Sequence, residues 1–401
     1  MKLLVIGFLN GLLFSGLALA EDWSIHLQAT AIDQYHDDFP ANYSGINSLS
    51  PSGEDKISFT STLFIGRTLW QGGLLYFTPE VAGGSGLSGT HGTAGFPNGE
   101  IYRVSSPEAE VSISRVYLKE DLGDHLTFIG GKFSLNDFFD NNIYSHDPRT
   151  QFTNWSLMDN GAWDYAADTR GYTWGFMLEY HEPQWAVRYS SALEPQQANQ
   201  MDMDMNINQA HGDNLELEIH YKIKDHPGAA RLLGYVNHAY MGIYQPGETD
   251  ITQTRNYRTK YGGGINLEQE LSSDFGAFFR AGWNDGKTES WAFTEVDETI
   301  SGGISLKGIS WNRIDDVYGL AFIINGISNP HADYLAGGGY GFIIGDGNLN
   351  YGPEQILETY YSYQVIKFFS ASLDYQFVNN PAYNRDRGPV NIYSARLHLE
   401  L

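Results

Sequence analysis

The feature that most constrains this chain is the spacing of its apolar residues. From Trp23 to Leu401 the sequence consists of short segments in which apolar and polar residues alternate, and the joints between these segments are alternately tight and long. Strict alternation is typical of β-strands with one apolar face. Strands joined in this way predict an all-β chain that closes into an antiparallel up-and-down barrel, with short turns at one end and long loops at the other.

The joints set the number of strands. The tight ones lie near residues 69–72, 121–124, 182–184, 225–228, 272–274, 310–315 and 366–367. The long ones span about 34–56, 83–108, 134–170, 194–213, 244–257, 285–297, 327–353 and 379–389. About sixteen strands result, and an even number brings both chain ends to the short-turn end, as in bacterial outer-membrane barrels.

The first residues predict export. Lys2 precedes an apolar run that ends in the small-residue pattern Ala18-Leu19-Ala20. This arrangement is typical of a secretory signal peptide, here residues 1–20, cleaved before Glu21. An uncleaved membrane helix is the alternative, because the run approaches spanning length. Since the chain has no cysteine for disulfides, we expect residues 21–401 to form a single barrel domain held by strand closure.

The alternation also predicts which face meets lipid. Between residues 215 and 223, for example, Leu215 and Leu217 alternate with Glu216 and Glu218. A soluble β-sandwich would alternate too, but with its apolar side inward. Strands of about nine to twelve residues are long enough to cross a bilayer, and aromatic residues flank many strand ends as in interfacial belts. We therefore predict that the apolar face contacts the lipid of a Gram-negative outer membrane.

The last segment agrees with a membrane location. Tyr393, Leu397 and Leu401 share one face of this segment, and Arg396 and Glu400 lie on the other. The segment resembles the C-terminal signal of outer-membrane barrels that the barrel-assembly machinery recognises, except that leucine replaces the usual terminal aromatic residue.

The charge balance disfavours several partners. Asp and Glu number 48 against 24 Lys and Arg, which gives a net charge of −24 at pH 7. Such a chain disfavours nucleic acid and anionic solutes as partners. The simpler interpretation is that the acids only solvate the loops and the lumen. A barrel of about sixteen strands encloses water, so a diffusion pore is the function expected by default.

One long joint, 134–170, carries the most specific signal. It is too long for a plain connection and too rich in aromatic and charged residues to be disordered. Together with other segments it resembles the carbohydrate-selective porins of Gram-negative outer membranes, the OprB-like family. The matching segments are Asp137-Phe138-Phe139-Asp140-Asn141-Asn142, Asp147-Pro148-Arg149-Thr150-Gln151-Phe152, Gly161-Ala162-Trp163-Asp164-Tyr165, Asp168-Thr169-Arg170-Gly171-Tyr172, Gly95-Phe96-Pro97-Asn98-Gly99-Glu100, Tyr334-Leu335-Ala336-Gly337-Gly338, Gly345-Asp346-Gly347 and Glu358-Thr359-Tyr360-Tyr361. Departures from the family pattern are Ala166, where the family often has proline, and Leu401.

The resemblance implies a sixteen-stranded barrel whose third long loop folds into the lumen. It also implies a constriction that passes neutral sugars beside arginines and an aromatic residue. Sugar hydroxyls bond well to charged groups, and sugar C–H faces pack on aromatic rings. The candidate substrate-binding residues are Arg149 and Arg170 in the loop, Arg188 and Arg280 on polar strand faces, and Trp155 and Trp163. The alternative is that the arginines only balance an acidic barrel and that the tryptophans anchor the loop to the wall.

The acids of the same loop are expected to fix it by pairing with arginines, because unpaired charges inside a barrel are costly. These acids are Asp137, Asp140, Asp164 and Asp168. Arg115 and Lys132 fall on the apolar face of their strands, so a bulge or an interfacial position would be needed to bring them inward, and we do not assign them to the site. Arg103 lies in the second long joint, within reach of the pore mouth.

No catalytic, cofactor or metal site is predicted. Residues 202–206 alternate oxygen ligands as a calcium loop does, but Ile207 stands where glycine is needed, and the chain has neither a nucleophile elbow nor a His-Glu-x-x-His motif. The main hypothesis is passive, substrate-biased diffusion of mono- or oligosaccharides. A general small-solute porin is the alternative of the same class. An outer-membrane barrel enzyme or a sugar-binding surface protein with a closed lumen is the alternative of another class. Monomer and trimer both stay open.

Overall fold

A single closed sheet makes up this protein. The computed structural model describes residues 22–401 except 105, 246 and 293. Within them sixteen strands pair antiparallel, each with its neighbours in sequence, and β1 pairs with β16 to close the barrel. The predicted sixteen-stranded up-and-down barrel is therefore confirmed, whereas the predicted signal peptide, residues 1–20, lies outside the described residues.

The strands have between 8 and 17 residues. They are β1 (Trp23–His36), β2 (Glu54–Trp70), β3 (Gly73–Gly84), β4 (Glu110–Leu122), β5 (Leu126–Phe133), β6 (Thr173–Glu182), β7 (Trp185–Leu193), β8 (His211–Ile223), β9 (His226–Met241), β10 (Asn256–Ser272), β11 (Phe275–Asn284), β12 (Glu298–Gly308), β13 (Arg313–Gly326), β14 (Glu354–Ile366), β15 (Phe369–Asn379) and β16 (Val390–Glu400). The helices are α2 (Trp155–Met158) and α3 (Asn329–Ala336), with short 3-10 helices at Leu87–Gly89, Ile101–Arg103, Leu135–Asp137, Ile251–Thr254, Ile309–Trp311 and Pro381–Tyr383. None of the described helices is long and apolar enough to cross a membrane.

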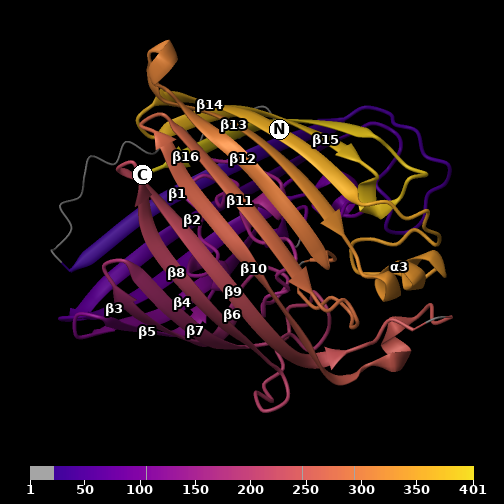
Figure 1. Ribbon diagram of the computed structural model, residues 1–401, viewed down its shortest axis with the longest axis horizontal. Helices are drawn as coiled ribbons and strands as arrows, with labels where there is room; N and C mark the ends of the chain where they lie inside the picture. Colours follow the sequence, from indigo (N-terminus) through magenta and orange to yellow (C-terminus); the bar gives the residue numbers. More distant parts are fainter. Residues whose placement is uncertain (1–21, 105, 246, 293) are drawn as a thin grey trace.

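The two ends of the barrel differ as the joints predicted. Short turns connect the strands at one end, and the long loops, with α3 among them, gather at the other (Figure 1). Leu27 and Leu401 exchange backbone hydrogen bonds of 3.0 and 2.8 Å, so the last residue lies at the short-turn end beside β1. The strand boundaries agree with the predicted joints within a few residues because the period of two breaks at each turn.

The barrel is apolar outside and polar inside. In β8, Leu215 is 55% exposed, whereas its neighbours Asn214 and Glu216 are buried. β11 repeats the pattern, with Phe279 exposed and Arg280 buried. Exposed apolar rows of this kind would be unstable in water but match hydrocarbon. The side of the alternation that faces lipid is thus the predicted one.

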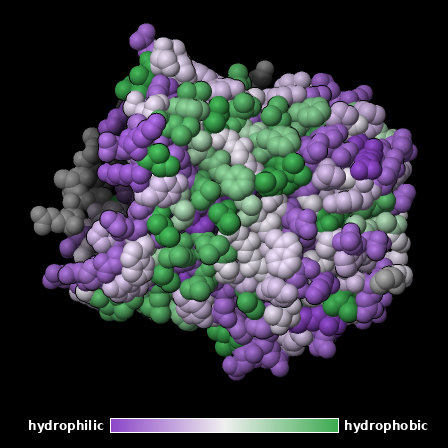
Figure 2. All heavy atoms as spheres, viewed as in Figure 1, coloured by the Kyte–Doolittle hydropathy of each residue, from purple (hydrophilic) through white to green (hydrophobic). Residues whose placement is uncertain are grey.

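On the face of the molecule shown in Figure 2, apolar side chains form a belt between two hydrophilic ends. Figure 2 shows this belt across the middle of one face, with polar residues gathered on either side of it. Trp70 at the end of β2 and Trp174 near the start of β6 are exposed at the borders of the strands. Such amphipathic rings are typical of the membrane–water interface.

One strand departs from simple alternation. The pairing of β3 with β4 shifts between Thr78 and Pro79, and Ser114 is the extra residue of this β-bulge. Ser114 and Arg115 are both buried, so the bulge turns Arg115 into the lumen. Proline cannot donate to a strand ladder and is tolerated at bulges, so Pro79 in the middle of an expected strand was the available signal.

Candidate functional site

The third loop (residues 134–172) turns back into the barrel instead of covering its end. Every residue from 152 to 168 is buried. Side chains of the strands β8, β10, β11, β14, β15 and β16 bind the loop from inside the wall. The loop therefore crosses the lumen and lies against much of its inner surface.

Carboxylates of the wall hold the backbone of this loop. Glu358 of β14 accepts hydrogen bonds from the N–H groups of Thr153 (2.5 Å) and Asn154 (3.1 Å). Glu216 of β8 accepts one from the N–H of Asp140 at 2.7 Å. A buried loop needs partners for its backbone N–H groups, and inward-facing acids supply them. Part of the acidic excess of the chain thus has a structural use.

Arginines of the wall bind the loop carbonyls in the same way. Arg280 of β11 is fully buried; its Nη1 donates to the carbonyl of Leu157 at 2.9 Å, and its Nε lies 3.0 Å from the Asp140 carboxylate. Arg396 of β16 donates to the carbonyl of Pro148 at 2.6 Å. These two arginines therefore hold two separate stretches of the loop. Arg280, a predicted solute contact, is enclosed by the loop that it holds.

The loop approaches the wall most closely over glycines. A Cβ atom added to Gly264 of β10 or to Gly282 of β11 would lie about 2 Å from the side chain of Asn160. No real side chain tolerates such a contact, so these glycines leave the space in which the loop lies.

Asp137 forms the tightest ion pair of the loop. Arg115 donates to its two carboxylate oxygens at 2.5 and 2.6 Å. Burial alone would raise the pKa of Asp137, but the charge of Arg115 outweighs burial and holds that pKa below its usual value. Sequence reasoning assigned Asp137 to loop fixing and left out Arg115, because only the bulge in β4 brings this arginine inside.

The other loop acids also have specific partners. Asp164 lies 3.2 Å from Lys260 Nζ and accepts the N–H groups of Trp291 and Ala292 from the sixth loop (residues 285–297). Asp140 pairs with Arg280 as described above, and because burial outweighs that pairing, its pKa is raised. Asp168 accepts the N–H of Tyr172 at 3.0 Å and lies 3.8 Å from Lys132. Lys132 lies on the outer face of the barrel, as its place in the alternation predicts. Its side chain reaches the loop from near the end of β5.

Both predicted tryptophans are buried. Trp155 stacks on Phe96 of the second loop (residues 85–109), with ring centroids 5.2 Å apart and an interplanar angle of 12°. Trp163 packs against Tyr165, and its Nε1 donates to Asn214 of β8 at 2.9 Å. These contacts favour the anchoring interpretation over a sugar-stacking one, since neither indole presents an open face.

The remaining predicted arginines keep partial access to solvent. Their side chains are 13% (Arg149), 11% (Arg170) and 14% (Arg188) exposed. Arg170 pairs with Glu110 at 2.7 Å, near the long-loop end. Arg188 of β7 binds three carboxylates, those of Glu179, Glu216 and Glu218. Among these three arginines, only Arg149 lies in the stretch of the third loop that contacts the second loop.

Arg149 joins the third loop to the second loop. Its Nε donates to Glu100 Oε1 at 2.9 Å, and the same oxygen accepts a hydrogen bond from Thr60 of β2 at 2.8 Å. Arg103 lies 3.5 Å from that oxygen and pairs with Glu80 at 2.9 Å. Two arginines and two acids therefore meet where the loops touch the wall of β2 and β3. Sequence reasoning missed Glu80 and Glu100, although Glu80 lies on the polar face of its strand.

A donor atom and an acceptor atom of this cluster form no hydrogen bond among the described residues. Within the described part of the chain, Arg149 Nη2 and Glu100 Oε2 are buried and have no hydrogen-bond partner. Both atoms are closed off from solvent, and the side chain of Glu100 is only 1% exposed, so the exposed part of Arg149 is what a solute can reach in this ion pair.

Comparison with known proteins gives a consistent result. The model of the carbohydrate-selective porin, OprB family, matches residues 47–401. The high-pH structure of OprB from Pseudomonas putida aligns with a TM-score of 0.73 at 14% identity, over 95% of this chain and 94% of that one. The outer-membrane channel DcaP of Acinetobacter baumannii aligns with a TM-score of 0.55 at 11% identity, over 95% and 97%. At these identities the two structures show the shared fold. No curated protein matches the sequence.

Proposed function

This chain belongs to the OprB family of carbohydrate-selective porins, and from that membership we propose how its lumen selects solutes. As a porin of this family it is an outer-membrane channel through which carbohydrates diffuse passively. The third loop forms the constriction, and Arg149, which Glu100 holds in place, forms its solute contact. The observation that carries this proposal is that Arg149, which binds Glu100 of the second loop from the third loop, keeps 13% of its side chain exposed.

A sugar hydroxyl suits this contact because its oxygen can accept a hydrogen bond from the guanidinium of Arg149, which only donates. An anion would meet the carboxylates of Glu80 and Glu100 as well as the arginines, so the cluster gives it no net advantage. A neutral solute can exchange its bonds with water for charge-assisted bonds of similar strength. Binding then stays weak enough for release, as conduction requires.

The other candidate residues act less directly in this proposal. Arg170 and Arg188, which keep partial exposure, contact solute above and below Arg149. Arg280, Trp155 and Trp163 hold the loop, and the four loop acids fix it through the partners given above: Asp137, Asp140, Asp164 and Asp168.

The proposal extends to export and assembly. Residues 1–20 are removed on export, and β16 carries the signal for the barrel-assembly machinery despite its terminal Leu401. The channel acts without catalysis, since diffusion through a polar lumen needs no reacting group.

Arg149→Ala tests the solute contact. Hydrogen bonds to charged groups contribute about 1.5–3 kcal/mol, so the sugar concentration that half-blocks ion current through the pore should rise about tenfold or more. The measurement is single-channel current in a planar bilayer with glucose added in steps. Trp155→Ala is a poorer test, because loss of a buried tryptophan costs about 3–5 kcal/mol through the cavity alone.

Arg67→Ala is the matched control. Arg67 lies on the outer face of β2, where it contacts the ring of Trp23. Its loss should leave the half-blocking glucose concentration unchanged. If Arg149→Ala and Arg67→Ala block alike while both give normal conductance, the proposed contact is wrong.

A further inference from the structure

A cavity lies between the third loop and the short-turn end of the barrel. Its volume is about 520 Å³, within the range of small-molecule sites. Inward-facing residues of β3, β4, β5 and β6 line it, and Phe138 of the third loop forms its roof. The turn residues Gly123 and Asp124 also line it, which places this space toward the short-turn end.

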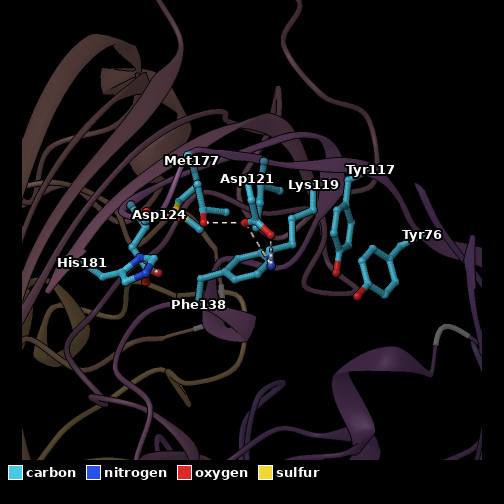
Figure 3. Close-up of a pocket in the computed structure, with 12 residues that line it drawn as sticks. Tyr76, Tyr117, Lys119, Asp121, Asp124, Phe138, Met177 and His181 are labelled. Carbon is cyan, nitrogen blue, oxygen red and sulfur yellow. Dashed lines mark hydrogen bonds and ion pairs between the residues drawn. The ribbon is translucent and has the colours of Figure 1, made fainter. Parts of the chain in front are cut away.

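One end of the cavity is aromatic (Figure 3). The rings of Tyr76 and Tyr117 are stacked with centroids 4.9 Å apart, and Phe138 meets Tyr117 edge to face at 6.1 Å. All three side chains are partly exposed. Aromatic rings on the polar face of a water-filled barrel offer apolar surface to the lumen, and the C–H face of a pyranose packs on such rings.

The other end is charged and hydrogen-bonding. Lys119 Nζ lies 3.3 Å from Asp121, and Thr127 donates to the same carboxylate at 2.8 Å. His181 lies toward Asp124 (Figure 3), and its Nδ1 is 3.5 Å from the carboxylate of Glu179. Lys119, Asp121 and His181 are each exposed by about a third or more. Donors and acceptors thus line the same cavity as the aromatic rings.

The charged residues that line the cavity favour a neutral ligand over an anion. One lysine stands among the carboxylates of Asp121, Asp124 and Glu179. The excess of negative charge repels anions, while a neutral sugar finds both acceptors and donors.

From this arrangement we infer a second sugar subsite, on the exit side of the constriction, in which Tyr76 and Tyr117 stack on a neutral pyranose and Lys119 with Asp121 binds its hydroxyls. This inference rests on the proposed function and adds a step to it: the sugar passes from Arg149 to an aromatic platform before release. Glu179, which lines the cavity, binds Arg188 of β7 at 2.5 Å.

Glucose added to one side of a single channel tests the inference. Stacking contributes about 0.5–1.5 kcal/mol, so Tyr76→Leu should weaken block by glucose from the short-turn side about two- to tenfold. Block from the long-loop side should stay as in the wild type, where Arg149 is met first. Tyr76→Phe keeps the ring and should keep the wild-type block. Tyr261→Leu, on the outer face of β10, is the control for loss of a tyrosine.

The outcomes separate the two proposals. Tyr76→Leu channels of normal conductance with wild-type block from the short-turn side would overturn the exit subsite while leaving the Arg149 contact in place. An equal loss of block from both sides would also overturn it, because a single site would then explain the data. If the wild-type channel shows no glucose block, the proposed function itself fails, and the exit subsite fails with it.

Discussion

Arg280→Ala should release the third loop from the barrel wall and let larger solutes through. Arg280 is fully buried and binds the carboxylate of Asp140 together with the carbonyl of Leu157. Removing one partner of a buried ion pair costs about 3–5 kcal/mol, since the other charge stays behind unpaired. The closed sheet itself does not depend on this contact, so we expect assembled barrels with a loosened loop. Swelling of liposomes in a series of mono-, di- and trisaccharides measures the result as faster entry of the larger sugars.

A second variant reaches the same end without touching a charge. Gly282→Leu would place a side chain where Asn160 now lies and push the loop off the wall. Arg313→Ala serves as the control, because Arg313 pairs with Asp316 at the short-turn end, away from the loop. If Arg280→Ala and Gly282→Leu both assemble and exclude trisaccharides as the wild type does, the third loop does not set the size limit.

Leu217→Arg should prevent stable insertion of the barrel. Leu217 lies midway along β8, on the outer face, between Val187 of β7 and Leu232 of β9. An arginine on the lipid face near the bilayer midplane costs about 2–4 kcal/mol, and much less near the interface. Folded barrel in outer membranes, measured as the band that shifts on heating before electrophoresis, should fall steeply for this variant.

The same substitution at the rim is the control. Leu122 is the last residue of β4 and is exposed at the short-turn end. Leu122→Arg should insert nearly as well as the wild type. Equal amounts of folded barrel for the two variants would contradict the orientation of the apolar face.

The fold was accessible from sequence because its main rule is local. A barrel strand shows its two faces within about ten residues, as Leu215 to Ile219 do in β8, and a turn interrupts the period wherever the chain reverses. Neither signal depends on distant contacts. The bulge at Ser114 could be named as a way to bring Arg115 inward but not assigned, because one extra residue leaves the alternation readable on both sides while it changes which face Arg115 occupies.

The site was only partly accessible because its contacts are long-range. The sequence shows that Arg149 and Asp137 carry charge, but not that their partners are Glu100 and Arg115. Trp155 is recognisable as a large aromatic residue, yet its burial depends on Phe96 of another loop. Partners that lie on different loops have no fixed spacing, so exposure and pairing inside the lumen could not be derived from the pattern of residues.

The central claim is that the polar face of this barrel encloses a water-filled path that binds neutral sugar weakly. The most direct test is the ion current of the purified, signal-free protein in a planar bilayer as glucose is raised. We predict a steady open current that falls with glucose and saturates, as occupancy of the constriction requires. A current that changes only with solution viscosity, or no current from correctly inserted barrels, would contradict the account.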